Sequence, residues 1–455
     1  MFHLQRSVSR PSSSSAPSNA PSTGHSRRAG AARGAFAFIV MMGVVSLFSD
    51  MTHEGARSIL GEYLNLTGAS ATAIGFVSGF GELCGYSLRI ISGYFADKSK
   101  NYWGLIIAGY TIQVVAIPAL ALIPEHGWIL ACSLVVAERI GKAVKKPAKN
   151  TLVSFAASEV GTGKGFAYQE FLDQLGAFLG PAMLFVIGLV QGTSHLFSTY
   201  RLSFALLGIP AAITISLLIA ARRAYPHPEN FEEPTPEEQG NAPHDEATSS
   251  DTPRNQSHDA QPSTSFHFRR SFAVYMIAIC LFAFGFADFT LITLHVAATH
   301  LFPAESYSLL YAGAMAVDAV AALVFGSLYD KVGLRALMIS TALSALFPPL
   351  IFLPHSAALI CLGIALWGVG MGAQESIMKA AVATIIPRSM RATGYGIFET
   401  GFGVAWFIGS WLLGYLYDTN LIALVIVSVT TQLLAIVFYF QCMRIAHNET
   451  SELLQ

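Results

Sequence analysis

Charged side chains are scarce in this sequence. Asp, Glu, Lys and Arg together make up 12% of its 455 residues, whereas a soluble domain carries about a quarter. Hydrophobic residues make up 53%, and the mean hydropathy is +0.51. This charge is too little to cover a water-facing surface, so lipid must face much of the chain.

Other scarcities narrow the function. The net charge of −1 argues against a nucleic-acid partner. The five cysteines lie inside apolar stretches without metal-type spacing, and we interpret them as small residues of the core or the lipid face. We find no catalytic motif, nucleotide-binding loop or cofactor motif, so we predict neither an enzyme nor a resident metal or cofactor.

Twelve apolar segments have the length of membrane spans, which is roughly 20 residues for a hydrocarbon core of about 30 Å. The first six run near Ala35–Leu60, Ala71–Phe95, Tyr102–Ile123, Gly127–Val144, Gly163–Val190 and Leu202–Ala221. The second six run near Phe272–Ala297, Tyr307–Tyr329, Leu334–Leu353, Ser356–Ile386, Thr393–Tyr417 and Leu421–Phe440.

Basic residues alternate from loop to loop. They gather before span one, after every even-numbered span and before span seven, as Arg27, Arg28, Arg33, Lys98, Lys100, Lys164, Arg222, Arg223, Arg269, Arg270, Lys331, Arg335, Arg388, Arg391 and Arg444. The intervening loops have no Lys or Arg apart from Arg201 at the mouth of span six. The positive-inside rule therefore predicts a multi-pass protein of the cell membrane with both termini in the cytoplasm.

Two segments do not belong to the spans. Residues 1–33 are rich in Ser, Pro and Arg without an acid, and residues 222–270 are rich in Pro, Ser and acids. We predict a disordered tail at 1–33 and a flexible cytoplasmic linker at 222–270. The remainder divides into a six-helix bundle at 34–221, a second at 271–444, and a tail at 445–455.

The two halves look like diverged copies, as transporters often show. Four features recur in the same order at a nearly constant offset, namely Asp50 with Asp288, Gly93 and Asp97 with Gly326 and Asp330, Lys149 with Lys379, and Glu170 with Glu399. This recurrence predicts an all-α fold of two pseudo-symmetric six-helix bundles.

The loops after spans two and eight carry the most specific motif. Gly93, Asp97 and Lys98 form one copy, and Gly326, Asp330, Lys331 and Arg335 form the other. With this motif the chain resembles the major facilitator superfamily from about Ala35 to Phe440. The resemblance implies a transporter of twelve helices in which these loops act as a cytoplasmic latch.

Spans four and five carry two further motifs of that resemblance. Arg139 matches a family motif linked to proton coupling, and Gly176, Gly180 and Pro181 resemble the helix-bending motif of family exporters.

Charges inside the membrane cost at least ~2.5 kcal/mol each, so they mark a pathway. They occur in eight spans, and the interiors of spans three, six, nine and twelve have none. Those four are the peripheral helices in the family that the sequence resembles. As candidates for transport and proton coupling we select Asp50, His53, Glu54, Arg57, Arg139, Glu170, Asp173, Asp288, Glu375 and Glu399.

Asp50, His53, Glu54 and Arg57 share one helix face because they are spaced i, i+3, i+4 and i+7. This face fits a proton-carrying carboxylate beside His53, a metal or cation site, or a neutralised structural network. Arg57 would repel a cation, so we rank metal binding below proton coupling.

Arg139 and Asp173 both fall near mid-membrane. Protonating a carboxylate beside the arginine would free it to pair elsewhere, which links proton uptake to rocking of the halves. For Glu138 we favour a static pair with Arg139, directed toward span three.

Lys142, Lys145, Lys146 and Lys149 form a basic stripe in span four. Most such stripes are lysines that reach the phospholipid headgroups. The alternative is an anionic substrate held at the cytoplasmic mouth.

These observations predict a monomeric secondary transporter in the bilayer. It moves a small solute by alternating access, coupled to protons and in the direction of export. The alternatives are an organic-anion/proton symporter, a metal-ion exporter and a receptor of the same fold that does not transport.

Overall fold

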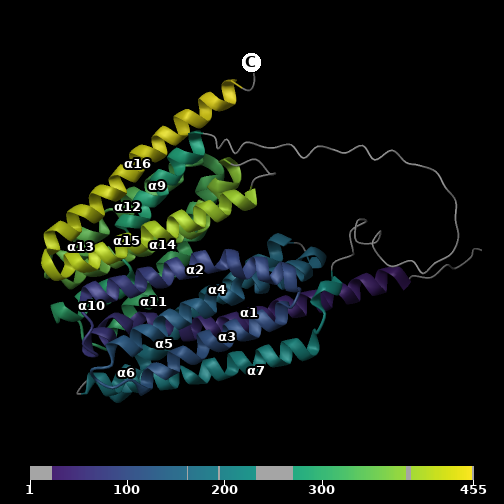
Figure 1. Cartoon of the computed structure of the whole chain (residues 1–455), viewed down its shortest axis with the longest axis horizontal. Coiled ribbons are helices and arrows are strands. Elements are labelled where there is room, and N and C mark those ends of the chain that lie inside the picture. The colour runs from purple at the N-terminus through teal and green to yellow at the C-terminus, as the bar shows by residue number, and fades with distance from the viewer. Residues whose placement is uncertain (1–22, 161, 193–194, 232–269, 386–390, 453–455) are drawn as a thin grey trace, which may run out of the picture.

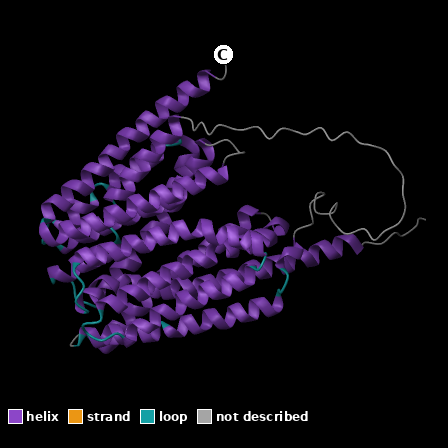
Figure 2. Cartoon of the chain, viewed as in Figure 1, coloured by secondary structure: helices purple, strands orange, loops and turns teal. Residues whose placement is uncertain are grey.

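The computed structural model of the chain describes residues 23–160, 162–192, 195–231, 270–385 and 391–452. These residues form two groups of helices that lie side by side, one from each half of the sequence (Figure 1). Figure 2 shows that helices make up most of the described chain and that short loops join them. The predicted tail and linker fall largely outside the described residues.

The first half holds seven helices and two short 3₁₀ turns. They are α1 (Thr23–Leu66), α2 (Ala71–Ser99), α3 (Tyr102–Ala119), η1 (Leu120–Leu122), α4 (Trp128–Val160), α5 (Thr162–Gln191), α6 (Leu196–Leu206), α7 (Gly208–Ala224) and η2 (Pro228–Phe231). Helix α1 begins at Thr23, inside the segment predicted as a tail.

The second half holds eight described helices. They are α9 (Arg270–Gly285), α10 (Phe289–Thr299), α11 (Ser306–Val332), α12 (Arg335–Ser344), α13 (Phe347–Phe352), α14 (Ala357–Ile385), α15 (Arg391–Thr419) and α16 (Leu421–Glu452). Gly333 ends α11 with φ +61°, a conformation that glycine adopts without the steric cost a side chain brings.

The twelve predicted spans are confirmed. Ten single or paired helices are long and apolar enough to cross a membrane, and α2 and α4 are the other two, with 29 and 33 residues. Three spans predicted as continuous helices are interrupted, which corrects the prediction. Span six divides into α6 and α7, span seven into α9 and α10, and span nine into α12 and α13.

Proline explains two of these interruptions. Pro210 lacks a backbone N–H and its ring clashes with the carbonyl four residues earlier, so α6 ends at Leu206. Pro348 acts in the same way on α12, which ends at Ser344. Span seven has no proline at its interruption, and there Asp288 N-caps α10.

The contact pattern repeats between the halves. Within the first half α1 packs on α5 and α7, and within the second half α9 packs on α15 and α16, the corresponding spans. Between the halves α2 packs on α15 and α5 packs on α11, and this pairing is also symmetric. The predicted pseudo-symmetric bundles are therefore confirmed.

The interface between the halves is closed at one end and divergent at the other (Figure 1). We call the end where α7 stops at Ala224 and α9 starts at Arg270 the linker end, and the opposite end the far end. The halves spread apart toward the linker end.

Glycines allow the helices of the two halves to touch near the far end. A Cβ on Gly75 of α2 would lie 2.3 Å from the carbonyl oxygen of Ser410 on α15, and one on Gly61 of α1 would lie 2.0 Å from that of Thr290 on α10. Asp418, at the end of α15, accepts hydrogen bonds from the backbone N–H groups of Ala71 and Thr72 at 3.2 and 2.8 Å. It thereby caps α2 from the other half.

Candidate functional site

A cavity of about 150 Å³ lies between the two halves, away from the far-end contacts. Most of its lining comes from the first half, on α1, α4 and α5, and the second half contributes Met315, Asp318 and Met371. Its charged lining residues are Asp50, Glu54, Arg57, Lys142, Lys145, Lys146, Lys149, Glu170, Asp173 and Asp318. Eight of the ten candidate residues selected from the sequence therefore lie in this cavity or in the polar network beside it.

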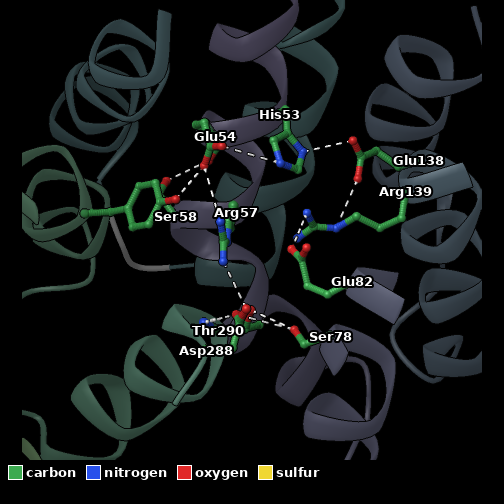
Figure 3. A network of polar contacts seen from close by, with 12 residues as sticks. His53, Glu54, Arg57, Ser58, Ser78, Glu82, Glu138, Arg139, Asp288 and Thr290 are labelled. Carbon is green, nitrogen blue, oxygen red and sulfur yellow. Dashed lines mark hydrogen bonds and ion pairs between the residues drawn. The ribbon is translucent and has the colours of Figure 1, made fainter. Parts of the chain in front are cut away.

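The four polar residues of the α1 face lie where their spacing predicts. His53 is 3% exposed and stands between two carboxylates, with Nδ1 2.9 Å from Oε1 of Glu138 and Nε2 3.5 Å from Oε1 of Glu54 (Figure 3). A doubly protonated imidazole donates at both nitrogens, whereas the neutral ring donates at one. One proton on this ring therefore changes its interaction with both carboxylates.

Arg139 continues the network toward α2. Its NH1 lies 2.7 Å from Oε1 of Glu82, and its Nε lies 3.5 Å from Oε2 of Glu138 (Figure 3). The carboxylates beside Arg139 are thus Glu82 and Glu138, and Asp173 is not among them. The expected static pair of Glu138 with Arg139 is corrected, because Glu138 also contacts His53 of α1.

Asp173 has a different cation. Its Oδ2 lies 3.4 Å from Nζ of Lys149, and its Oδ1 accepts a hydrogen bond from Nε2 of Gln169 at 3.0 Å. Lys149 also donates to Oγ of Ser46 at 2.5 Å. The register along α4 explains the correction, because Lys149 lies nearly three turns closer to the linker end than Arg139.

The interruption of span seven supplies the link between the halves. Asp288 follows the end of α9, N-caps α10 by accepting from the backbone N–H of Thr290 at 2.9 Å, and also accepts from the hydroxyl of Thr290. Oδ2 of Asp288 accepts from NH2 of Arg57 at 3.0 Å, and both side chains are buried (Figure 3). The indole N–H of Trp367 donates to the carbonyl of Ala287 at 2.9 Å, which satisfies part of the backbone freed by the break.

Tyr311 of α11 provides a second link across the halves. Its hydroxyl donates to Oε2 of Glu54 at 2.5 Å, and the same oxygen lies 3.9 Å from NH1 of Arg57. Glu54 therefore touches His53, Arg57 and the opposite half at once. Sequence reasoning missed Tyr311, because a single tyrosine in an apolar span carries no signal of its own.

The basic stripe of α4 faces the protein interior. Lys145 and Lys149 are 5% and 8% exposed, and all four lysines line the cavity. The interpretation that most of them reach lipid headgroups is wrong, because Lys145 and Lys149 are buried and all four lysines line the cavity between the halves. Lys145 donates to Oγ of Ser49 at 2.9 Å and lies over the ring of Tyr110 at 3.7 Å.

The glycines of α5 form a close crossing with α1. A Cβ on Gly176 would lie 2.3 Å from the carbonyl oxygen of Leu47, and one on Gly180 would lie 2.2 Å from that of Met51. The corresponding contact in the other half is between α15 and α9, where a Cβ on Gly409 would lie 2.1 Å from the carbonyl oxygen of Phe284. These glycines and Pro181 thus bring the α1 face and α5 together around the cavity.

The remaining candidates lie closer to the linker end. Glu170 is exposed in the cavity lining, and Glu399 is half-buried on α15, while the side chain of Glu375 is outside what the structure describes.

The two latch motifs lie at the linker end. Gly93 is half-buried with Lys98 exposed, and Gly326 is half-buried with Asp330, Lys331 and Arg335 exposed. The side chain of Asp97 is outside the described set.

No group of three or more His, Cys, Asp or Glu side chains in the described ranges is arranged to hold a metal ion.

Comparison with protein families gives one match across the chain. The sequence model described as Major Facilitator Superfamily matches residues 34–301 and 277–452. An uncharacterised protein of Mycobacterium tuberculosis is 37% identical over 406 residues, which is 89% of this chain and 93% of that protein. An uncharacterised MFS-type transporter of Methanocaldococcus jannaschii is 27% identical over 151 residues, which is 33% of this chain and 37% of that protein.

Solved structures show the same fold. A mutant of the nucleoside transporter NupG superposes with a TM-score of 0.67 at 14% identity, covering 90% of this chain and 99% of that one. A POT family transporter in complex with 5-aminolevulinic acid gives 0.66 at 14% identity, with 90% and 96% covered. A bacterial homologue of the human lysosomal transporter Spinster, in an inward-facing and occupied conformation, gives 0.60 at 16% identity, with 89% and 96% covered.

Proposed function

The chain belongs to the Major Facilitator Superfamily, and from that premise we propose that it is a proton-coupled carrier of a small polar solute that works by alternating access. Its fold and family support secondary transport. The coupling to protons, the solute and the membrane are the parts that we propose.

The observation that carries the proposal is the buried link between the halves beside the cavity. Arg57 of the first half pairs with Asp288 of the second at 3.0 Å, and Tyr311 of the second half donates to Glu54 of the first at 2.5 Å. A carrier that alternates must break such contacts between its halves and form them again. A charge change at the link therefore biases one arrangement over the other.

Glu54 is the residue through which we propose that protons act. Its carboxylate lies 3.5 Å from Nε2 of His53 and 3.9 Å from NH1 of Arg57. When Glu54 takes up a proton, it loses its attraction for Arg57 and for a protonated His53. The bonds between the halves are then redistributed around Asp288.

Orientation follows from the basic residues of the loops. The exposed Lys98, Arg222, Arg223, Lys331 and Arg335 all lie at the linker end. By the positive-inside rule we propose that this end and both termini face the cytoplasm, and that the cavity opens inward. The expectation of export came from Gly176, Gly180 and Pro181, and close packing on α1 accounts for both glycines, so the proposal concerns coupling and not direction.

The test uses purified full-length protein in liposomes that contain a trapped pH-sensitive dye. Labelled amino acids, carboxylates, nucleosides and sugars are added one at a time, and both solute uptake and dye response are recorded. We expect at least one solute to move protons in a protein-dependent manner. The Glu54→Gln variant is expected to keep exchange of that solute but to lose the proton movement.

The matched control is Glu125→Gln, which removes one carboxylate from an exposed position of the far-end loop. This variant should behave as wild type. Solute exchange by wild-type protein without any proton movement would refute the coupling, and loss of exchange in both variants would show damage unrelated to Glu54.

A further inference from the structure

The cavity is markedly asymmetric in its cations. All five of its basic lining residues come from the first half: Arg57 on α1 and four lysines on α4. Arg57 forms an ion pair with Asp288, with NH2 3.0 Å from Oδ2, and Lys149 forms one with Asp173, with Nζ 3.4 Å from Oδ2.

Lys145 and Lys142 lack such a partner. Among the described residues, no carboxylate lies within 4.0 Å of the ammonium group of either lysine. Lys145 is 5% exposed, and its contacts are a neutral hydroxyl, that of Ser49, and the ring of Tyr110. A hydroxyl uses one of the three ammonium donors and does not neutralise its charge. In its protonated form Lys145 therefore keeps spare donors at the cavity wall.

Asp50 is the carboxylate of the α1 face that lines the cavity without a cation within 4.0 Å, as far as the described residues show. Around it the cavity presents Glu54 and Arg57 from α1, the four lysines from α4, Glu170 and Asp173 from α5, and Asp318 from α11. A proton on Asp50 would remove a negative charge from the wall that carries Lys145. The cavity would then attract an anion more strongly.

We propose that this cavity binds a small anion, carboxylate or phosphate, through Lys145 and Lys142, and that a proton on Asp50 strengthens this binding. The inference rests on the proposed carrier function and specifies its substrate class. The volume of about 150 Å³ suits a compact solute, since pockets for drug-sized ligands run to ~300–1,000 Å³.

The experiment measures binding by thermal stabilisation of the purified full chain in nanodiscs of phosphatidylcholine. The probes are benzoate, its uncharged analogue benzamide, the cation benzylammonium and inorganic phosphate, at constant ionic strength in mildly acidic and mildly alkaline buffer. We expect benzoate or phosphate to stabilise the protein, more strongly in acid, and the other two probes to have little effect.

Three variants locate the effect. Lys145→Met should weaken the binding of the effective anion roughly tenfold to hundredfold, the size of a lost charge-assisted hydrogen bond. Arg223→Met, which removes an exposed cation outside the cavity, should bind as wild type. Asp50→Asn should bind the anion in alkaline buffer as strongly as wild type does in acid.

Equal stabilisation by benzamide or benzylammonium, stabilisation by none of the probes, or unchanged anion binding in Lys145→Met would overturn the proposal. Nanodiscs that contain phosphatidylglycerol form a further arm. If this lipid stabilises wild type but not Lys145→Met, and abolishes the further stabilisation of wild type by the soluble anion, a lipid headgroup is the anion that the site holds.

The two proposals fail in different ways. Proton-coupled uptake of cations or neutral solutes alone would refute the proposed anion site and support the carrier function. Binding of an anion that depends on Lys145, without any solute flux, would support the anion site and refute the carrier function.

Discussion

Replacing Asp288 by asparagine separates its charge from its role as a helix cap. Asparagine remains a good N-cap for α10, but Arg57, which is 6% exposed, loses the carboxylate at 3.0 Å. Removing one partner of a buried ion pair costs about 3–5 kcal/mol. Because Glu54 remains 3.9 Å from Arg57, we expect the lower value, about 3 kcal/mol.

Asp288→Ala should cost more than Asp288→Asn. Alanine also removes the oxygen that accepts from the N–H of Thr290 at 2.9 Å, and loss of a cap costs about 1 kcal/mol. We therefore expect the free energy of unfolding to fall in the order wild type, Asp288→Asn, Asp288→Ala. Equilibrium unfolding in mixed micelles of increasing SDS content, followed by circular dichroism, measures the series.

A double-mutant cycle with Arg57→Met tests the cause. If Arg57 is the source of the cost, Asp288→Asn should be much less harmful in the Arg57→Met background than in wild type. Additive effects of the two substitutions, or an Asp288→Asn variant within about 0.5 kcal/mol of wild type, would refute the reasoning.

Three further predictions concern the packing of the helices. Gly75→Leu should force α2 from α15 and open the far end, so that a single cysteine introduced at the buried Ser410 reacts faster with a maleimide. The control Gly313→Leu should leave that rate unchanged, because a Cβ at Gly313 would have no atom within 4 Å. Gly176→Leu should separate α5 from α1 and lower the stability by about 1–3 kcal/mol or more, measured by the same SDS titration. Asp418→Ala should remove the cap of α2 at a cost of about 0.5–2 kcal/mol and raise the maleimide rate at position 410; an unchanged rate would show that this contact does not hold the far end closed.

Local features of the sequence were sufficient to predict the membrane spans and the polar face of α1. An apolar run of spanning length is read within one segment, and the spacing of Asp50, His53, Glu54 and Arg57 fixes their common face without knowledge of any other helix. The interruption of span seven also had a local signal, because Asp288 followed by Thr290 is a pattern of a helix N-terminus. The strongly apolar segment around it concealed that signal.

The partners of these residues depend on how helices distant in sequence are arranged. Arg57 and Asp288 are 231 positions apart, and Glu54 and Tyr311 are 257 apart. The prediction placed Arg139 and Asp173 at the same depth in the membrane, but Asp173 lies level with Lys149, nearly three turns along α4 from Arg139. Arg139 pairs with Glu82 instead.

The basic stripe shows why charge in a span must be judged together with its neighbours. Within the described chain, α2 and α4 are the two spans that are less apolar than the ten candidate membrane helices. They carry Glu82, Glu138 and Arg139 besides the lysines of α4. Charges on a helix that faces lipid would be costly, which favours lysines that reach the headgroups. On α4 the same lysines line the cavity between the halves. One of the least apolar spans, α4, therefore supplies all four lysines of the cavity, and a weak hydropathy signal between strong ones is itself evidence for a polar pathway.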